Sequence, residues 1–445
     1  RAPYEKGWRY GEGRARCVVL PSDTDAVSAL MRVCAAHDAR VQPIGANTGL
    51  VAASNPDASG EQVVVSFERM NRIVAVDPVD RVAVVQAGVT LNTLNEALAE
   101  HGLWFPVDLG ADPQIGGMVA TNTGGTRLVR YGDVRRNLLG VEVVLADGTV
   151  VPRAPALRKN NTGLDLQQLF VGTSGRFGLV TAAALALAPR PAQRTTLLFG
   201  VDDGEVALRL LKAVERRYGD FLAAFEAISR EAVEVTVHRG SRVRDPFPDR
   251  SFPLLGLVEF ATSVDAAHLA LPQLVLSGVS DLAETIDGLD AEAILLEQDD
   301  AFWHLRHSLT EALRLEGTIL AFDLSVPRSC LAVFSRAIRE LVARMQPEAR
   351  VCDYGHWGDG GTHVNLLLPD GIEPGDADWV ALQDAVYALC VEDFGGSYSA
   401  EHGVGPHNQH VYDRYASDAQ REASGLLETH FDPGRRIGTV RWGRR

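Results

Sequence analysis

Three histidines and a glutamate, set among glycines, are the residues of this sequence best suited to chemistry. His356 and His363 flank the segment Trp-Gly-Asp-Gly-Gly-Thr, and Glu401 and His402 follow further along the chain. A continuous strand would place His356 and His363 on opposite faces, because side chains alternate along a strand. The Gly-Asp-Gly-Gly between them is typical of a turn. We therefore expect a hairpin that brings both imidazoles to one end of a sheet.

Two imidazoles and one carboxylate are a ligand set for a divalent metal ion that leaves coordination positions open. The metal-binding residues predicted on this basis are His356, His363 and Glu401. His402, next to the carboxylate, would then remain available for proton transfer. The alternative interpretation is a glycine-rich turn with two surface histidines, and the spacing alone does not exclude it.

Two glycine-rich segments indicate a binding site for an anion such as a pyrophosphate. They are Pro-Ile-Gly-Ala-Asn-Thr-Gly at 43–49 and a longer segment at 110–125 that contains the pairs 116–117 and 124–125. Small residues let backbone N–H groups converge on an anion, and Asn and Thr side chains add donors. An extended cofactor such as FAD would use both segments, whereas ordinary tight turns are the alternative. No GxGxxG follows the first predicted strand, so a nicotinamide-binding Rossmann domain has little support.

The composition is that of a folded chain with an acidic surface. Its 445 residues are 46% hydrophobic, enough for two or three domains with large cores. The net charge of −15 argues against binding to nucleic acid or to an anionic membrane surface. The five cysteines include no CxxC, which is typical of a reducing compartment and argues against a zinc ribbon.

No apolar run reaches 18 residues, so no membrane span is expected. The first residue is Arg, which leaves a targeting segment undecided. We expect the protein in the cytoplasm, with a peripheral association with a membrane left open.

Hydrophobic periodicity predicts short strands mixed with helices, and the Pro-Arg-Pro at 189–191 is the best candidate for a domain boundary. Beyond it we expect antiparallel strands with helices on one face. A helix is expected to begin at Asp23 or Thr24 and to carry Val27 and Met31 inward. The other predicted helices are Leu91–His101, Glu205–Tyr218, Ala266–Leu276, Asp299–Leu315 and Ser329–Met345. The predicted strands are Cys17–Leu20, Val41–Ile44, Gln62–Phe67, Arg72–Val76, Arg81–Ala87, Leu138–Leu145, Gly178–Leu187, Thr195–Phe199, Leu255–Phe260, Thr318–Leu324 and Val364–Leu368.

Taken in order, several segments resemble the FAD-linked oxidoreductases of the vanillyl-alcohol-oxidase type. Within that family they are most similar to the D-2-hydroxy-acid dehydrogenases, which act on D-lactate or D-2-hydroxyglutarate. The resemblance runs from about residue 15 to residue 435. The matching segments are Pro43–Val51, Pro106–Gly125, Arg130–Asp133, Arg158–Gly163, Gly172–Thr181, Trp303–Arg306, His356–Asn365 and Ser399–Gly405.

The resemblance implies an α+β fold in three parts. Residues 1–190 would form an FAD-binding domain of two subdomains, and residues 191–400 an antiparallel-sheet substrate (cap) domain. Residues 401–445 would form a C-terminal helical segment that returns to the flavin. The FAD would be non-covalent, because the first loop carries Asn47-Thr48 and no histidine. The residues implied to contact FAD are Pro43, Gly45, Ala46, Asn47, Thr48, Gly49, Leu50, Gly110, Gly116, Gly117, Thr121, Asn122, Gly124, Gly175, Gly178 and Val180.

The resemblance also implies roles for the polar residues of the second half. A divalent ion, usually zinc, would be held by the two loop histidines and Glu401, and His402 would be the base. Arg306 and Thr310 match positions that hold a substrate carboxylate, and Asn365 matches a polar substrate contact. Lys159, one of only three lysines, is interpreted as a contact at the flavin edge or with the substrate.

Four departures from the branch indicate altered specificity. Ala321 stands where the 2-hydroxyglutarate enzymes usually have a lysine, which argues against a dicarboxylate substrate. Gly172–Gly175 replaces Gly-Ser-Glu-Gly and lacks its carboxylate. The lysine that commonly follows Glu-His-Gly-x-Gly is absent, with Pro406–Asn408 in its place, and the closing Asn-Pro-Gly-Lys is replaced by Gly438–Arg441.

Together these features predict FAD-dependent, divalent-metal-assisted oxidation of a D-2-hydroxy acid to the 2-oxo acid, with hydride transfer to flavin N5. The expected partners are a small anionic 2-hydroxy acid and an electron acceptor: a quinone, an electron-transfer flavoprotein or a cytochrome. A homodimer is left open. Two alternatives from other classes are a metal-dependent hydrolase that uses the same His/His/Glu set and a non-catalytic flavoprotein subunit.

Overall fold

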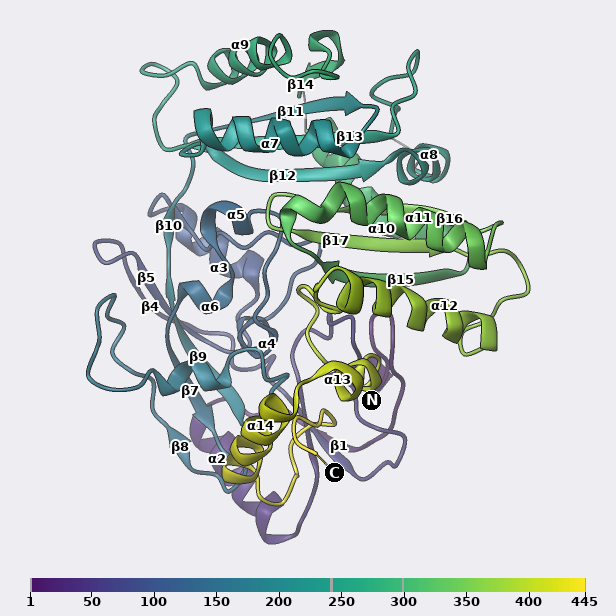
Figure 1. Cartoon of the computed structure of the whole chain (residues 1–445). Helices are drawn as coiled ribbons and strands as arrows, with labels where there is room; N and C mark the ends of the chain where they lie inside the picture. The colour runs from purple at the N-terminus through teal and green to yellow at the C-terminus, as the bar shows by residue number, and fades with distance from the viewer. Residues whose placement is uncertain (1, 241–242, 298–299, 445) are drawn as a thin grey trace. The chain divides into compact units, whose positions relative to one another are not determined.

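The computed structural model describes residues 2–240, 243–297 and 300–444, and the chain divides into two compact units. Unit 1 is formed by the residues up to 125, by 131–190 and by the residues from 401 onwards. Unit 2 is formed by 126–130 and 191–400. The predicted α+β fold class is confirmed, because helices and mainly antiparallel sheets alternate along the chain (Figure 1).

Unit 1 contains two main sheets and a short strand pair. The three-stranded sheet has the order β1-β3-β2 and is parallel. The five-stranded sheet has the order β4-β5-β9-β7-β8 and is antiparallel. The strands are β1 Ala15–Val19, β2 Val41–Ile44, β3 Gln62–Ser66, β4 Ile73–Asp77, β5 Val82–Gln86, β6 Leu103–Trp104, β7 Leu138–Val144, β8 Val150–Val151, β9 Leu179–Ala186 and β10 Ala188–Pro189. The helices are α1 Ala2–Glu5, α2 Thr24–Ala36, α3 Leu91–Ala99, α4 Ile115–Thr121, α6 Val134–Asn137, η1 Leu166–Phe170, α13 Gln409–Tyr415 and α14 Asp418–Phe431, with α5 Leu128–Tyr131 at a junction of the units.

The core of unit 1 forms because each element buries one apolar side. Asp23 caps α2 by accepting a hydrogen bond from the N–H of Ala26 at 2.8 Å. Val27 and Met31, one turn apart on α2, are fully buried against strand residues of both main sheets. The last stretch of the chain joins this core through Ile437, which bridges to Val41 beside β2.

Unit 2 is built on one sheet of seven strands in the order β14-β11-β13-β12-β16-β17-β15, and all the pairings are antiparallel. The strands are β11 Gln193–Val201, β12 Leu222–Ser229, β13 Leu254–Thr262, β14 Ile294–Leu296, β15 Ile319–Ser325, β16 Arg350–Gly355 and β17 Gly361–Leu367. The helices are α7 Gly204–Tyr218, α8 Arg230–Arg239, α9 Leu271–Ala283, η2 Ala291–Ala293, α10 Ala301–Glu316, η3 Arg328–Cys330, α11 Leu331–Met345, α12 Ala377–Ala388 and the π-turn η4 Leu389–Asp393.

The centre of this sheet carries the predicted histidine hairpin. Strands β16 and β17 pair through the turn at 356–360, and the N–H of Gly361 donates to the Asp359 carboxylate at 2.9 Å. Leu309 and Leu313 on the apolar side of helix α10 belong to the same buried cluster as Ile228 of β12. The hairpin is therefore held between β12 and β15 in the interior of unit 2.

Most of the predicted elements are present, and three predictions need correction. The expected helix Ala266–Leu276 is α9, and it starts at Leu271, because Pro272 suits a first turn while Asp265 holds a turn at 267–268. The second glycine segment is not all loop, since 115–121 form helix α4. Strand β12 was not predicted. The predicted helix start at Asp299 lies outside the described residues.

Candidate active site

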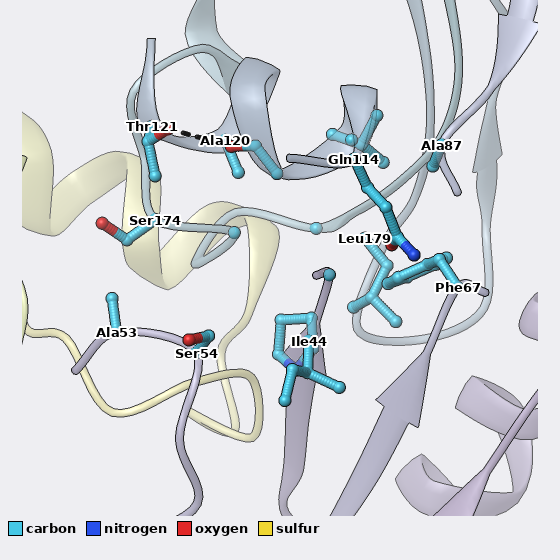
Figure 2. Close-up of a pocket in the computed structure, with 17 residues that line it drawn as sticks. Ile44, Ala53, Ser54, Phe67, Ala87, Gln114, Ala120, Thr121, Ser174 and Leu179 are labelled. Atoms are coloured by element: carbon cyan, nitrogen blue, oxygen red, sulfur yellow. Dashed lines mark hydrogen bonds between the residues drawn. The ribbon is translucent and has the colours of Figure 1, made fainter. Parts of the chain in front are cut away.

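A cavity in unit 1 is lined by the two glycine-rich segments and by the start of β9. It contains about 570 Å³ of space, including the part that is open to solvent. Figure 2 shows Ile44 at the end of β2 with Ser54 near it, and Gln114 and Ala120 at the two ends of α4 with Ser174 on the same side as Ala120. The last stretch of the chain runs alongside, where the Ser174 hydroxyl donates to the carbonyl of Val404 at 2.7 Å. The cavity wall is thus made of small residues and backbone.

About half of the lining residues belong to the predicted FAD contacts. These are Pro43, Gly45, Gly116, Gly117, Thr121, Gly175, Gly178 and Val180. The sequence reasoning missed the other lining residues, which are Ile44, Ala53, Ser54, Phe67, Ala87, Gln114, Ala120, Ser174 and Leu179. Several of the missed residues are adjacent in sequence to a predicted one, and this adjacency could have indicated them.

Two features of the cavity suit a cofactor that has a polar edge and that lies close to the protein backbone. Gln114 is 7% exposed, and its Oε1 is buried without a hydrogen-bond partner. Such an orphaned acceptor costs free energy unless a ligand or water satisfies it. A Cβ built on Gly117 would meet nothing within 4 Å, so this glycine leaves open space where a cofactor can reach the backbone. The unsatisfied acceptor and the open backbone therefore suit FAD.

The other predicted loop residues do not line this cavity. They are Ala46, Asn47, Thr48, Gly49, Leu50, Gly110, Asn122 and Gly124. The amide of Asn47 donates to the carbonyl of Lys6 at 2.7 Å, and its oxygen accepts from Ser54. Asn122 ends α4 in the left-handed conformation and donates to Asp133 at 2.8 Å. Both asparagines hold loops in place with their side chains.

The two hairpin histidines of unit 2 face each other through their Nε2 atoms, 3.4 Å apart. His356 is buried, and its Nδ1 lies 2.6 Å from Oε1 of Glu226 on β12. His363 has Oδ1 of Asp323, its cross-strand neighbour on β15, at 3.8 Å from its Nδ1. His356 thus has a carboxylate hydrogen-bonded behind its ring, an arrangement found for histidines that bind metal ions, whereas the Asp323 carboxylate is beyond hydrogen-bonding distance of His363 Nδ1.

The buried carboxylate of Glu226 lies between the His356 imidazole and the Arg306 guanidinium. Its second oxygen accepts from Nε of Arg306 on α10 at 2.6 Å. Burial raises the pKa of Glu226, but the charges of His356 and Arg306 and their hydrogen bonds outweigh it and lower the pKa to about 2. The residue is therefore an anion at neutral pH. Sequence reasoning missed it, although a lone charge inside the apolar run 222–228 was a signal that a buried partner exists.

The remaining predicted catalytic residues lie on α10, on β17 and in an irregular segment of unit 1. Arg306 is buried, and its guanidinium carbon lies 4.9 Å from the ring centre of Tyr354. Thr310, one turn along α10, shares a 2.8 Å hydrogen bond with the Tyr354 hydroxyl. Asn365 is buried two residues after His363 on β17. Lys159 is exposed in an irregular segment of unit 1 and is not among the cavity-lining residues.

Glu401 and His402 open the last stretch of unit 1. His402 Nε2 lies 3.8 Å from Glu401 Oε1. Further along, His407 stacks on Tyr10 with ring centres 3.7 Å apart. Burial, and then the charges of Arg9, His410 and His402, lower the pKa of His407 to about 4. His407 is therefore neutral at physiological pH and acts as a packing group.

Comparison with known proteins supports what the fold and the cavity indicate. Residues 15–152 match the FAD binding domain, and residues 190–437 match the C-terminal domain of FAD linked oxidases. The chain is 35% identical to the mitochondrial D-2-hydroxyglutarate dehydrogenase of Bos taurus, over 88% of this chain and 70% of that protein. It is 32% identical to the D-2-hydroxyglutarate dehydrogenase of Stutzerimonas stutzeri, over 97% and 91%. The solved structure of an alkyldihydroxyacetonephosphate synthase is similar in fold, with a TM-score of 0.69 and 16% identity over 94% of this chain and 76% of that one.

The chain belongs to the FAD-linked oxidases. Within that family it is an FAD-dependent dehydrogenase related to the D-2-hydroxyglutarate dehydrogenases. This confirms the predicted resemblance and the FAD cofactor, and it replaces the hydrolase and non-catalytic alternatives. Among the described helices, none combines the length and apolar character that a bilayer crossing requires.

Proposed function

We propose that this dehydrogenase oxidises a D-2-hydroxy acid to the 2-oxo acid with the help of a divalent ion, zinc in the first instance, held by His356, His363 and Glu401. FAD, when bound, supplies the hydride acceptor, the flavin N5. The observation that carries the proposal is the 3.4 Å separation of the two histidine Nε2 atoms. Two nitrogen ligands of a tetrahedral zinc ion lie roughly 3.3–3.4 Å apart, as the usual bond length of about 2.05 Å requires.

The chain itself favours Glu401 as the third ligand. The N–H of Ala400 donates to the carbonyl of Asp323 at 3.1 Å, and Asp323 pairs with His363 across β15 and β17. Glu401 is the next residue, so its backbone begins about 3.8 Å from the Cα of an anchored residue. An ion in this place would act as a Lewis acid toward the substrate oxygen.

The proposed catalytic work of the protein is to orient the acid and to move one proton. An unprotonated ring nitrogen of His402 accepts the proton of the substrate hydroxyl. Arg306 and Thr310 orient the carboxylate. Nε of Arg306 donates to Glu226, which fixes the orientation of the guanidinium toward a substrate. Asn365 contributes a polar contact, and Lys159 is proposed to act at the edge of the flavin or substrate.

D-2-hydroxyglutarate is the first substrate to test, because the relatives are named as D-2-hydroxyglutarate dehydrogenases. Ala321, however, favours a shorter acid such as D-lactate. Ala321 lies opposite Asn365 in the pairing of β15 with β17. An alanine there offers no charge to a second carboxylate, whereas a lysine would. The proposed electron acceptor is a quinone, an electron-transfer flavoprotein or a cytochrome, and assembly as a homodimer stays part of the proposal.

The test is anaerobic flavin reduction by a panel of D- and L-2-hydroxy acids, after chelation and after addition of zinc or manganese. We expect the yellow flavin to bleach with a D-acid and only in the metal-loaded enzyme. The variant Ala321→Lys should shift preference from D-lactate toward D-2-hydroxyglutarate. Full-rate bleaching by the metal-free enzyme would refute the role of the ion, and equal rates with L-acids would refute the substrate class.

A further inference from the structure

Glu226 contacts two residues of the proposed site at once. Its side chain is fully buried, on a strand whose neighbours at 222–225 and 227–228 are apolar. One oxygen lies 2.6 Å from Nδ1 of His356, and the other accepts from Nε of Arg306 at 2.6 Å. Burying a carboxylate is costly unless each oxygen is hydrogen-bonded. Both partners are therefore part of what keeps Glu226 charged inside the sheet.

The contact with His356 decides which ring nitrogen carries the proton. A carboxylate at 2.6 Å accepts a hydrogen bond, so it holds the proton on Nδ1. In the neutral ring, which is the form that binds a metal ion, Nε2 carries the lone pair and faces Nε2 of His363. Only an unprotonated nitrogen can bind a metal ion, and a carboxylate behind the ring makes that nitrogen a stronger ligand.

The contact with Arg306 decides how the guanidinium is turned. Its Nε is fixed by Glu226 on one side, and its plane lies near the ring of Tyr354. The hydroxyl of Tyr354 is in turn hydrogen-bonded to Thr310. A planar guanidinium whose Nε is held by a buried carboxylate has a fixed orientation, which suits the binding of a carboxylate.

We propose that Glu226 is a positioning residue that sets the metal affinity of His356 and the carboxylate affinity of Arg306 through a single side chain. The inference rests on the proposed function, because it assumes that the two histidines hold an ion. It implies that metal binding and substrate binding are weakened together when the carboxylate is lost.

The experiment measures zinc affinity of the FAD-loaded enzyme by competition with a chelating dye, and KM and kcat at saturating zinc for the D-acid that reduces the flavin best. In Glu226→Gln the amide can accept from only one of its two partners through its oxygen. We expect zinc affinity to fall by about 10- to 100-fold. At saturating zinc we expect KM to rise by roughly 10-fold or more, as a misdirected guanidinium loses its carboxylate contact.

Glu259→Gln is the matched control. Glu259 is 2% exposed on the neighbouring strand β13, and it binds Nε and a terminal nitrogen of Arg127 at 2.6 and 2.9 Å. This variant removes the same kind of buried charge from the same sheet. We expect it to lower the melting temperature as Glu226→Gln does and to leave zinc affinity and KM unchanged. A loss of zinc affinity in both variants would show a general loss of packing and would overturn the inference.

Two further variants keep the outcome clear if Glu226→Gln does not fold. Arg306→Met should keep most of its zinc affinity and lose substrate affinity, because Glu226 keeps its hydrogen bond with His356. The double variant Glu226→Gln/Arg306→Met removes both buried charges and should bind zinc more weakly than Arg306→Met alone. Equal affinity in these two overturns the inference. Zinc binding that is absent from the parent enzyme, or unchanged in His356→Ala, overturns the proposed function instead.

Discussion

Two adjacent glycines of α4 should respond in opposite ways when each receives a methyl group. A Cβ on Gly116 would lie 2.7 Å from the Cβ of Ala87 and 3.2 Å from its carbonyl oxygen. A Cβ on Gly117 would meet nothing within 4 Å, and this residue lines the cavity. We therefore expect a methyl group on Gly116 to disturb packing and a methyl group on Gly117 to disturb cofactor binding.

The expected magnitudes follow from these distances. Replacing Gly by Ala inside a helix contributes about 0.8–1 kcal/mol of stability when the methyl group has room. Gly117→Ala should therefore make the FAD-free protein more stable by up to about 1 kcal/mol. The same methyl group would compete with bound FAD, and overpacking costs about 1–3 kcal/mol. FAD affinity should fall by roughly 5- to 150-fold.

Gly116→Ala should behave in the reverse manner. The new methyl group presses on the backbone of Ala87, whose carbonyl accepts from the N–H of Gly116 at 2.8 Å. Overpacking of about 1–3 kcal/mol offsets or exceeds the helix gain, so the FAD-free protein should lose up to about 2 kcal/mol of stability.

The assay combines urea unfolding of the FAD-free proteins with titration of FAD by flavin fluorescence. Each variant serves as the control for the other, because the same atom is added one residue apart on one helix. If Gly117→Ala binds FAD as tightly as the parent, the cofactor does not occupy this cavity and the reasoning is wrong.

Three other perturbations give distinct readouts. His402→Ala should keep the flavin but lose turnover by ~10²-fold or more, and unchanged kcat would remove His402 from the mechanism. The pKa of His407 is lowered to about 4 in the folded protein, against an ordinary value near 6.5. Because the unfolded chain takes up this proton first, the contribution of His407 to stability is complete above pH 6.5 and is lost as the pH falls toward 4. The free energy of unfolding should change by at most about 3 kcal/mol over this pH range. In His407→Phe, the free energy of unfolding should depend less steeply on pH. Arg176→Met leaves Glu428 and Asp432 buried without their cation and should cost about 3–5 kcal/mol of stability, measured by urea unfolding.

The elements that sequence predicts best here are those with local signals. Val41–Ile44 has the bounds of β2, and the Gly-Asp-Gly-Gly at 358–361 marks the turn between β16 and β17. Turn chemistry and hydrophobic periodicity act over a few residues, so one sequence contains them in full. The hairpin therefore brought two histidines together as expected.

What sequence did not predict depends on partners far along the chain. Glu226 is 130 residues from His356 and 80 from Arg306, and no local pattern connects them. Strand β12 was missed because all of its positions are buried, so alternation of polar and apolar residues is absent. The two glycines of α4 look alike in sequence and both line the cavity, and only the position of Ala87 shows that Gly116 has no room for a methyl group.

Unit 1 is built from three separate segments of the chain, so it cannot be completed until the last of them has been synthesised. The stretch after residue 400 supplies Ile437 beside β2, and it supplies Glu428 and Asp432 to the buried Arg176. On the ribosome, β2 and Arg176 emerge long before these partners exist. These contacts of unit 1 can therefore form only after the whole of unit 2 has been synthesised. We expect chains that end before residue 401 to bind FAD more weakly than the full-length chain.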